Sequence, residues 1–337
     1  MKSLNLKAWL QPVLTCLLLA GLGGVFVWNN LQWIKQSYSF WLFSSSPAHL
    51  YASYSLERLF LSSGFWGFIG KLWVPWCYPP LVYLISLPFY LMGKPVFETA
   101  VLSQGIFVLI LAFSIWGAAR RLFNAPVAWL TVFIVLSLPG IQLMGKYYML
   151  DLPLTAMVSL AFYFYLSSEH FESLPYSLLF ALAFGLGLLT RYQMAFYLAG
   201  LFLYEIVWQL GKTGRKWLVT AYFGLLLLNL GLNLLGIKHT VPMLWLLLLN
   251  LASLALLLAL SRMAPAPDKP RFTHLTLAYF LLLFPASAFL HLSWPQISWM
   301  WQHDFHYQQQ GIFQGIYQPF FLWIYAIFLP GQFSLGI

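Results

Sequence analysis

Long apolar stretches separated by short polar segments run through almost the whole chain. A helix that crosses a hydrocarbon core of about 30 Å needs about 20 apolar residues. On this measure the sequence predicts membrane-crossing helices at residues 11–28, 97–119, 126–145, 152–167, 175–190, 193–210, 217–236, 241–260, 274–292 and 317–330. The pattern therefore predicts an all-α polytopic membrane protein, a bundle of about ten transmembrane helices.

Composition agrees with this fold class and excludes others. Of the 337 residues, 61% are hydrophobic and 7% are charged, whereas a soluble domain carries about 25% charged residues. Such a chain could not cover a surface in water with polar groups, which excludes a cytosolic enzyme, a disordered chain and a secreted disulfide scaffold. We expect one membrane domain over 1–337, with the bundle after the first span at 97–330.

Residues 29–96 form a long connection between the first two predicted spans. The stretch LERLFLSSGFWGFIGKLW within it has the mixed polar and apolar pattern of helices that lie in the membrane interface. The run 79–93 would be about 22 Å long as a helix, which is short for a core of about 30 Å. Whether this run crosses decides the side on which every later loop lies.

The distribution of Lys and Arg favours a run 79–93 that does not cross, because cytoplasmic loops carry an excess of these residues. In that case the basic clusters near residues 120, 215 and 265 lie on the same side as the N-terminus; otherwise the bias reverses. We therefore expect 29–96 to be an outer loop. A cleaved signal peptide is the alternative for 11–28, but Trp28 and Trp33 at its end favour an uncleaved span.

Asp151 lies in the stretch KYYMLDLPLTA, at the junction of two apolar runs and, on this topology, on the outer side. A carboxylate so close to the hydrocarbon is costly unless it has a partner or a function. The alternative is an N-cap, because Asp followed by Pro153 is typical of a helix start. Both interpretations stay open.

Arg191 lies between two predicted spans in GLGLLTRYQMAF, again on the outer side. A guanidinium there can bind a phosphate through two parallel hydrogen bonds. The alternative is an arginine that extends to the lipid headgroups. Lys146 invites the same two interpretations more weakly.

The outer stretch LSWPQISWMWQHDFHYQQQGIFQG contains Trp301 beside His303, Asp304 and His306. Aromatic faces and Gln side chains suit a sugar or a lipid headgroup. The His-Asp-x-His pattern could also supply metal ligands, so a divalent cation is the one cofactor that the sequence leaves open. An interfacial aromatic belt is the alternative.

Three segments, in this order, resemble the GT-C superfamily of integral-membrane glycosyltransferases, of the protein O-mannosyltransferase and lipid A aminoarabinose transferase type. They are the outer loop that ends in WCYPPLVYLISLPFYLMGKPVFETAVL, the stretch GKYYMLDLPLTAMVSLAFYFYL and the stretch GLGLLTRYQMAF, and together they cover about residues 45–205. The charge-based topology puts all three on one face of the membrane.

The resemblance implies a GT-C-like bundle that transfers a sugar from a polyprenyl phosphate to an acceptor on the non-cytoplasmic face. In such enzymes a carboxylate of the first outer loop takes the proton of the acceptor hydroxyl while the lipid phosphate leaves. By position, Asp151 matches the second-loop Asp of the family. Arg191 matches the basic residue that would hold the phosphate, and Lys146 is a further candidate for that role.

The first outer loop departs from the family pattern. Where the family has Asp or Asp-Glu, this chain reads SSSPAHLYASYSLERLF. His49, whose ordinary pKa is near neutrality, and Glu57 are the candidate bases in its place. Candidates for contacting the substrate are the aromatic residues Tyr78, Tyr147, Tyr192 and Trp301.

Three hypotheses of function follow. The first is a hexosyl or pentosyl transferase that uses a polyprenyl-phosphate sugar donor on the periplasmic or extracellular side of a bacterial plasma membrane. The second is a transporter or flippase of a lipid-linked substrate, for which Glu205 is the one ionisable residue within a span. The third is an inactive, truncated relative, since the first-loop Asp is missing and the chain stops before the later spans of the family.

The expected partners are the lipid-linked donor, an acceptor that the sequence does not identify, and membrane lipid. A formal net charge of +9 fits contact with anionic lipid. No basic run with interleaved aromatic residues is present, so we expect no nucleic acid.

Overall fold

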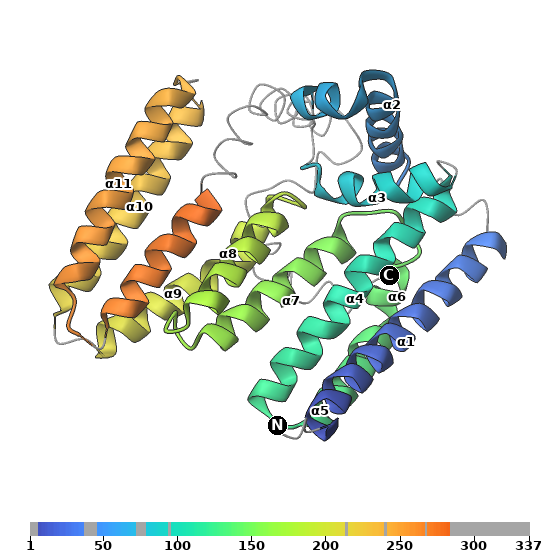
Figure 1. Cartoon of the computed structure of the whole chain (residues 1–337), viewed down its shortest axis with the longest axis horizontal. Helices are drawn as coiled ribbons and strands as arrows, with labels where there is room; N and C mark the ends of the chain where they lie inside the picture. Colours follow the sequence, from blue (N-terminus) through green and yellow to red (C-terminus); the bar gives the residue numbers. More distant parts are fainter. Residues whose placement is uncertain are drawn as a thin grey trace, which may run out of the picture.

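The computed structural model describes residues 6–36, 46–71, 79–93, 96–212, 215–238, 241–266 and 268–283, with side chains except at 6–10, 46–48, 69–71 and 237–238. Every regular element in these ranges is a helix (Figure 1). The helices are α1 (Leu6–Gln36), α2 (Ser46–Lys71), α3 (Leu81–Met92), α4 (Phe97–Leu122), α5 (Ala125–Ser137), α6 (Pro139–Met144), α7 (Asp151–Ser168), α8 (Leu174–Leu188), α9 (Met194–Lys212), α10 (Lys216–Lys238) and α11 (Met243–Met263), followed by a helical segment over 269–283.

The all-α membrane architecture predicted from the hydrophobic pattern is confirmed. The described helices that are long and apolar enough to cross a membrane are Gln11–Gln36, Phe97–Leu122, Met194–Lys212, Lys216–Gly236 and Met243–Met263. The helices α3, α5 and α8 are apolar but shorter. The number of about ten spans stays a prediction, and the run 317–330 lies outside the described residues.

The single helix predicted over 126–145 is wrong, because the structure divides it into α5 and α6. Leu138 between them has a ψ of 131°, far from the helical value. Pro139 explains the break, since it has no N–H to donate and disfavours a helical conformation in the residue before it. The side chain of Gln142 donates to the carbonyl of Leu136 at 2.6 Å, which satisfies one backbone group that the break leaves free.

The middle of the bundle is formed by α4, α7 and α8, with α4 along α7 and α7 along α8 (Figure 1). Gly117 of α4 shows how close the first pair is. A Cβ atom there would lie 2.5 Å from the ring of Tyr163 on α7, which is well inside van der Waals contact. Small residues at such crossings let helix backbones approach in a membrane, where dispersion contacts drive helix association.

The helix α7 defines two ends of the bundle. Its 18 residues are about 27 Å long, close to the thickness of a hydrocarbon core. Its first residue, Asp151, lies at the end that also holds α2 and α3, which we call the α3 end (Figure 1). Just after its last residue, Glu169 pairs with Arg121 at the end of α4; we call this the Glu169 end.

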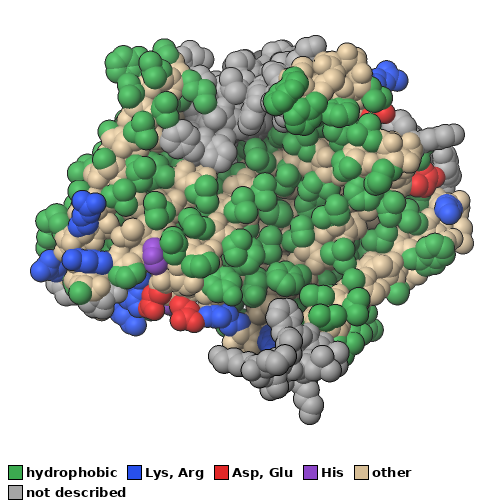
Figure 2. Space-filling model, viewed as in Figure 1, with side chains coloured by type: hydrophobic (Ala, Val, Ile, Leu, Met, Phe, Trp, Pro, Cys, Tyr) green, Lys and Arg blue, Asp and Glu red, His purple; other side chains and the backbone are tan. Residues whose placement is uncertain are grey.

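Between the two ends, hydrophobic side chains cover the face seen in Figure 2, and charged side chains gather along its margins. A hydrophobic surface between two charged margins is typical of a protein that lies in a lipid bilayer. At the α3 end, α3 has 12 residues, or about 18 Å, which is too short to cross the core alone.

Candidate functional site

A tight turn between α8 and α9 holds Arg191. The backbone N–H groups of Thr190 and Arg191 both donate to the carbonyl of Gly187, at 3.0 and 2.9 Å. A Cβ at Gly187 would lie 2.6 Å from the side chain of Met194, so the turn closes tightly around this glycine. The buried hydroxyl of Thr190 donates to the carbonyl of Leu186 at 3.0 Å. The sequence GLGLLTR thus fixes where the arginine side chain starts.

Asp151 and Arg191 form an ion pair, in which Nη1 of Arg191 donates to Oδ1 of Asp151. Both side chains are partly buried, with 28% and 29% of their surface exposed. Asp151 occupies the first turn of α7, whose N-cap is Leu150 and has no side-chain cap. The N-cap alternative for Asp151 is therefore wrong: its carboxylate faces a cation and gains from the helix dipole instead.

Arg191 has hydrogen-bond donors left after this pairing. A guanidinium carries five N–H groups, and the ion pair uses Nη1. Its Nε is buried and has no acceptor in the part of the chain that the structure describes. A buried donor without an acceptor costs about 1–3 kcal/mol. The site therefore offers an anion both positive charge and unused donors.

His49 lies on α2 and is 5% exposed. Its Nδ1 is 2.8 Å from the hydroxyl oxygen of Tyr83 on α3. Burial lowers the pKa of His49 to about 4; the positive charge of Arg191 adds to this shift, and the Asp151 carboxylate opposes it. The imidazole is therefore neutral at pH 7. It lies close enough to Arg191 and Asp151 for both charges to change its pKa.

The start of α3 connects His49 to the arginine turn. The N–H of Leu81 donates to the carbonyl of Leu189 at 2.9 Å, so the first turn of α3 rests on the last turn of α8. Two residues after Leu81, Tyr83 is 1% exposed and meets His49. The geometry thus brings residues from the connection 29–96 to the same end as Asp151 and Arg191.

A buried chain of hydroxyl groups supports this end. Ser53 donates to Tyr90 at 2.9 Å, Tyr148 donates to Ser53 at 3.1 Å, and Ser86 lies 2.8 Å from Tyr148. These residues come from α2, α3 and the segment before Asp151. Burial raises the pKa of Tyr148, so its hydroxyl stays protonated. Ser86 stands out in the sequence because it interrupts an apolar run, but the sequence does not indicate its hydrogen-bond partners.

The other predicted site residues lie in different surroundings. The Lys146 ammonium is 4.8 Å from the centre of the Trp33 ring on α1. Glu57 is buried on α2 and makes no ion pair with a described residue. Tyr147 and Tyr192 are half-buried beside Asp151 and Arg191 in sequence, and partial burial raises the pKa of Tyr147. Tyr78 and Trp301 lie outside the described residues, as do His303, Asp304 and His306.

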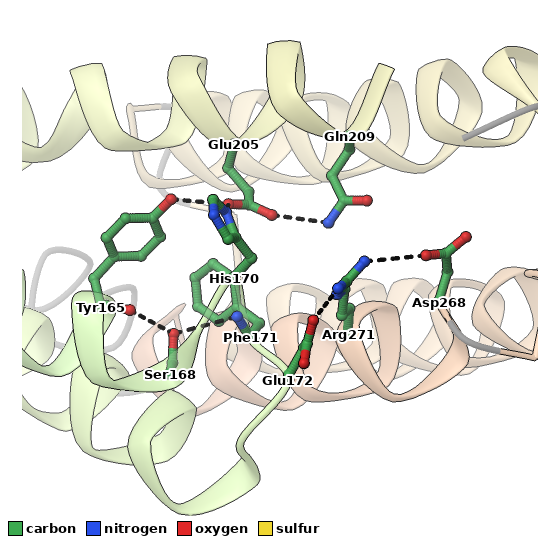
Figure 3. Close-up of polar contacts among 9 residues, drawn as sticks. All are labelled: Tyr165, Ser168, His170, Phe171, Glu172, Glu205, Gln209, Asp268 and Arg271. Atoms are coloured by element: carbon green, nitrogen blue, oxygen red, sulfur yellow. Dashed lines mark hydrogen bonds and ion pairs between the residues drawn. The ribbon is translucent and has the colours of Figure 1, made fainter. Parts of the chain in front are cut away.

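A second polar cluster, at the Glu169 end, surrounds the buried carboxylate of Glu205 (Figure 3). Tyr165 donates to it at 2.9 Å, the Nδ1 atom of His170 lies at 2.9 Å, and Gln209 donates at 2.8 Å. Sequence reasoning placed Glu205 within a span but missed these partners. Both carboxylate oxygens therefore have partners among the described residues, and these contacts join α9 to α7 and to the turn after α7.

The backbone of the turn after α7 is unusual. Glu169, His170 and Phe171 all have positive φ, between 51° and 63°. Each such residue costs about 1–2 kcal/mol outside glycine. Glu169 pairs with Arg121 and His170 lies against Glu205, so the turn is tied to its neighbours.

No group of three or more His, Cys, Asp or Glu residues that could hold a metal ion occurs in the described ranges. The arrangement at the α3 end is instead an arginine–carboxylate pair with a neutral imidazole nearby. Such a set can bind a phosphate and accept a proton.

Part of the chain is similar to a known protein family. Residues 78–235 match the family model described as dolichyl-phosphate-mannose-protein mannosyltransferase. Asp151 and Arg191 lie inside the matched segment, and His49 precedes it. No curated protein and no solved structure matches the chain. The family match confirms the resemblance given by the sequence motifs: residues 78–235 have the sequence pattern of a membrane glycosyltransferase of the GT-C type.

Proposed function

We propose that the protein transfers a sugar from a polyprenyl-phosphate donor to an acceptor hydroxyl at the α3 end. The observation that carries this proposal is the ion pair of Asp151 and Arg191, formed by residues 40 positions apart. The guanidinium, with its spare donors, binds the donor phosphate. Asp151 holds the guanidinium in place, and the half-buried Tyr147 and Tyr192 contact the substrate beside the pair.

In the transfer, the bond from the anomeric carbon to the phosphate oxygen breaks and a bond to the acceptor oxygen forms. The leaving phosphate keeps the bonding electrons, and Arg191 stabilises its growing charge. The acceptor loses its proton to His49. Glu57 is the second candidate base.

The test is sugar transfer by the purified full-length protein, incubated with a panel of radiolabelled polyprenyl-phosphate sugars and hydroxyl acceptors in lipid. We expect one donor class to lose its label to an acceptor with release of polyprenyl phosphate. Flux of intact donor across the bilayer without transfer would favour a transporter instead. Donor binding with neither transfer nor flux would favour an inactive relative.

We further propose that the α3 end faces the non-cytoplasmic side, as the distribution of Lys and Arg requires. In a background without the native Cys16 and Cys77, Gln193→Cys, an exposed position next to the arginine turn, should react in intact cells with a maleimide that does not cross membranes. Lys212→Cys, at the other end of α9, should react only after permeabilisation. The reverse pattern would contradict this orientation.

A further inference from the structure

Five of the exposed cations at the Glu169 end form one group, which we call the basic edge: Lys212, Arg215, Lys216, Arg262 and Lys269. They come from the last turn of α9, the start of α10, the last turn of α11 and the start of the segment 269–283. In Figure 2, Lys and Arg side chains gather along the lower left margin, where Figure 1 places these helix ends.

The carboxylates at this end are already engaged. Figure 3 shows Arg271 between Glu172 and Asp268, with which it forms ion pairs. Glu205 faces inward, as described above, and Glu169 pairs with Arg121. Within the described ranges, none of the five cations of the basic edge forms an ion pair with a carboxylate. Their charge is therefore not balanced by any carboxylate in the described part of the chain.

Two of these cations, Lys212 and Arg215, are held by contacts with neighbouring residues. Arg215, just before α10, donates to the carbonyl of Met263 at the end of α11, at 2.8 Å. The Lys212 ammonium lies 4.4 Å from the centre of the Trp208 ring. His170 stacks on the same indole with a ring separation of 3.7 Å, which ties Lys212 to the turn after α7.

The depth of the basic edge in the membrane follows from the helices that carry it. α9, α10 and α11 each contain a candidate span, and Lys212, Arg215, Lys216 and Arg262 lie at or next to the ends of these spans. Exposed apolar side chains adjoin them: Trp217 is 56% exposed and Met263 is 50% exposed. The basic edge thus combines exposed apolar side chains with cations that pair with no described carboxylate. This combination is typical of protein surfaces at the boundary between the hydrocarbon core and the lipid phosphates.

We propose that the basic edge binds the headgroups of anionic phospholipids in the leaflet at the Glu169 end. Each cation near an anionic membrane surface contributes attraction that falls off within a Debye length. A soluble phosphate compound would engage the charges but would leave Trp217 and Met263 in water. The combination of charge and exposed apolar surface therefore fits a lipid.

The test is native mass spectrometry of the full-length protein in neutral detergent, titrated with phosphatidylglycerol or with phosphatidylcholine of the same acyl chains. We expect phosphatidylglycerol to bind about tenfold more tightly or better. The variants K212Q/K216Q and R262Q/K269Q should each weaken its binding about tenfold, with phosphatidylcholine unchanged.

The matched control is K35Q/R58Q, which removes the same charge from two exposed positions on α1 and α2. It should change phosphatidylglycerol binding less than about twofold. Equal binding of the two lipids by the wild type, or an equal loss in the control, would overturn the proposal. Displacement of phosphatidylglycerol by excess glycerol phosphate would also overturn it, because it would indicate a phosphate site. Circular dichroism of each variant checks that the helices remain intact.

Discussion

Replacement of Arg191 by alanine is expected to lower kcat/KM for sugar transfer by at least about 100-fold, the usual loss when one group that stabilises transition-state charge is removed. The loss should appear in donor KM as well as in kcat, because the guanidinium contacts the phosphate before and during its departure. Arg191→Lys should recover part of the activity, since it keeps the charge but not the fork of donors. Donor titrations of the three proteins provide the measurement.

The comparison variant is Lys146→Ala. Its ammonium lies over Trp33, so we expect a smaller loss than for Arg191→Ala. If Arg191→Ala retained wild-type donor affinity and kcat while its thermal unfolding was unchanged, Arg191 would not be the phosphate ligand. A larger loss in the Lys146 variant would assign the phosphate to the segment before Asp151 instead.

The second large effect is expected at His49. Because its pKa is lowered to about 4, the imidazole is in its basic, neutral form at all pH values well above 4. Transfer should therefore stay constant from neutral pH down to about pH 5 and decline as the pH approaches 4. A histidine with an ordinary pKa near 6.5 would instead lose activity already through that value. The measurement is kcat/KM as a function of pH.

His49→Leu should lower kcat by a factor of about 10²–10⁴, the range typical for a general base. Glu57→Gln is the discriminating variant, because Glu57 is the other candidate base on α2. If Glu57→Gln lowered kcat by such a factor and His49→Leu kept a kcat near that of the wild type, the proton transfer would be assigned to Glu57. If wild-type activity fell through pH 6.5, the buried environment would not control the base in the reaction.

The meeting of Asp151 and Arg191 could be expected from the sequence, and the reason is physical. Both residues adjoin apolar runs long enough to fix their level in the membrane, and the distribution of Lys and Arg put them on the same side. The break before α6 was also readable, since Pro139 is visible in the sequence. We predicted a continuous helix there because the apolar length outweighed the proline.

The approach of His49 to the ion pair could not be derived in the same way. It depends on how α2 packs on α3, and on the backbone contact of Leu81 with Leu189; both are tertiary contacts without a local sequence signal. The same holds for Glu205. Its charge inside a span was evident, but its partner His170 lies in a turn of positive φ that the residue types there do not indicate.

A double-mutant cycle in the transfer assay tests most directly whether Asp151 and Arg191 act as one unit that holds the donor phosphate. If the unit exists, Asp151→Asn combined with Arg191→Ala should be within about threefold of the worse single variant, because the second change removes an interaction already lost. Losses that multiply would show that the two residues contribute independently and would contradict the account.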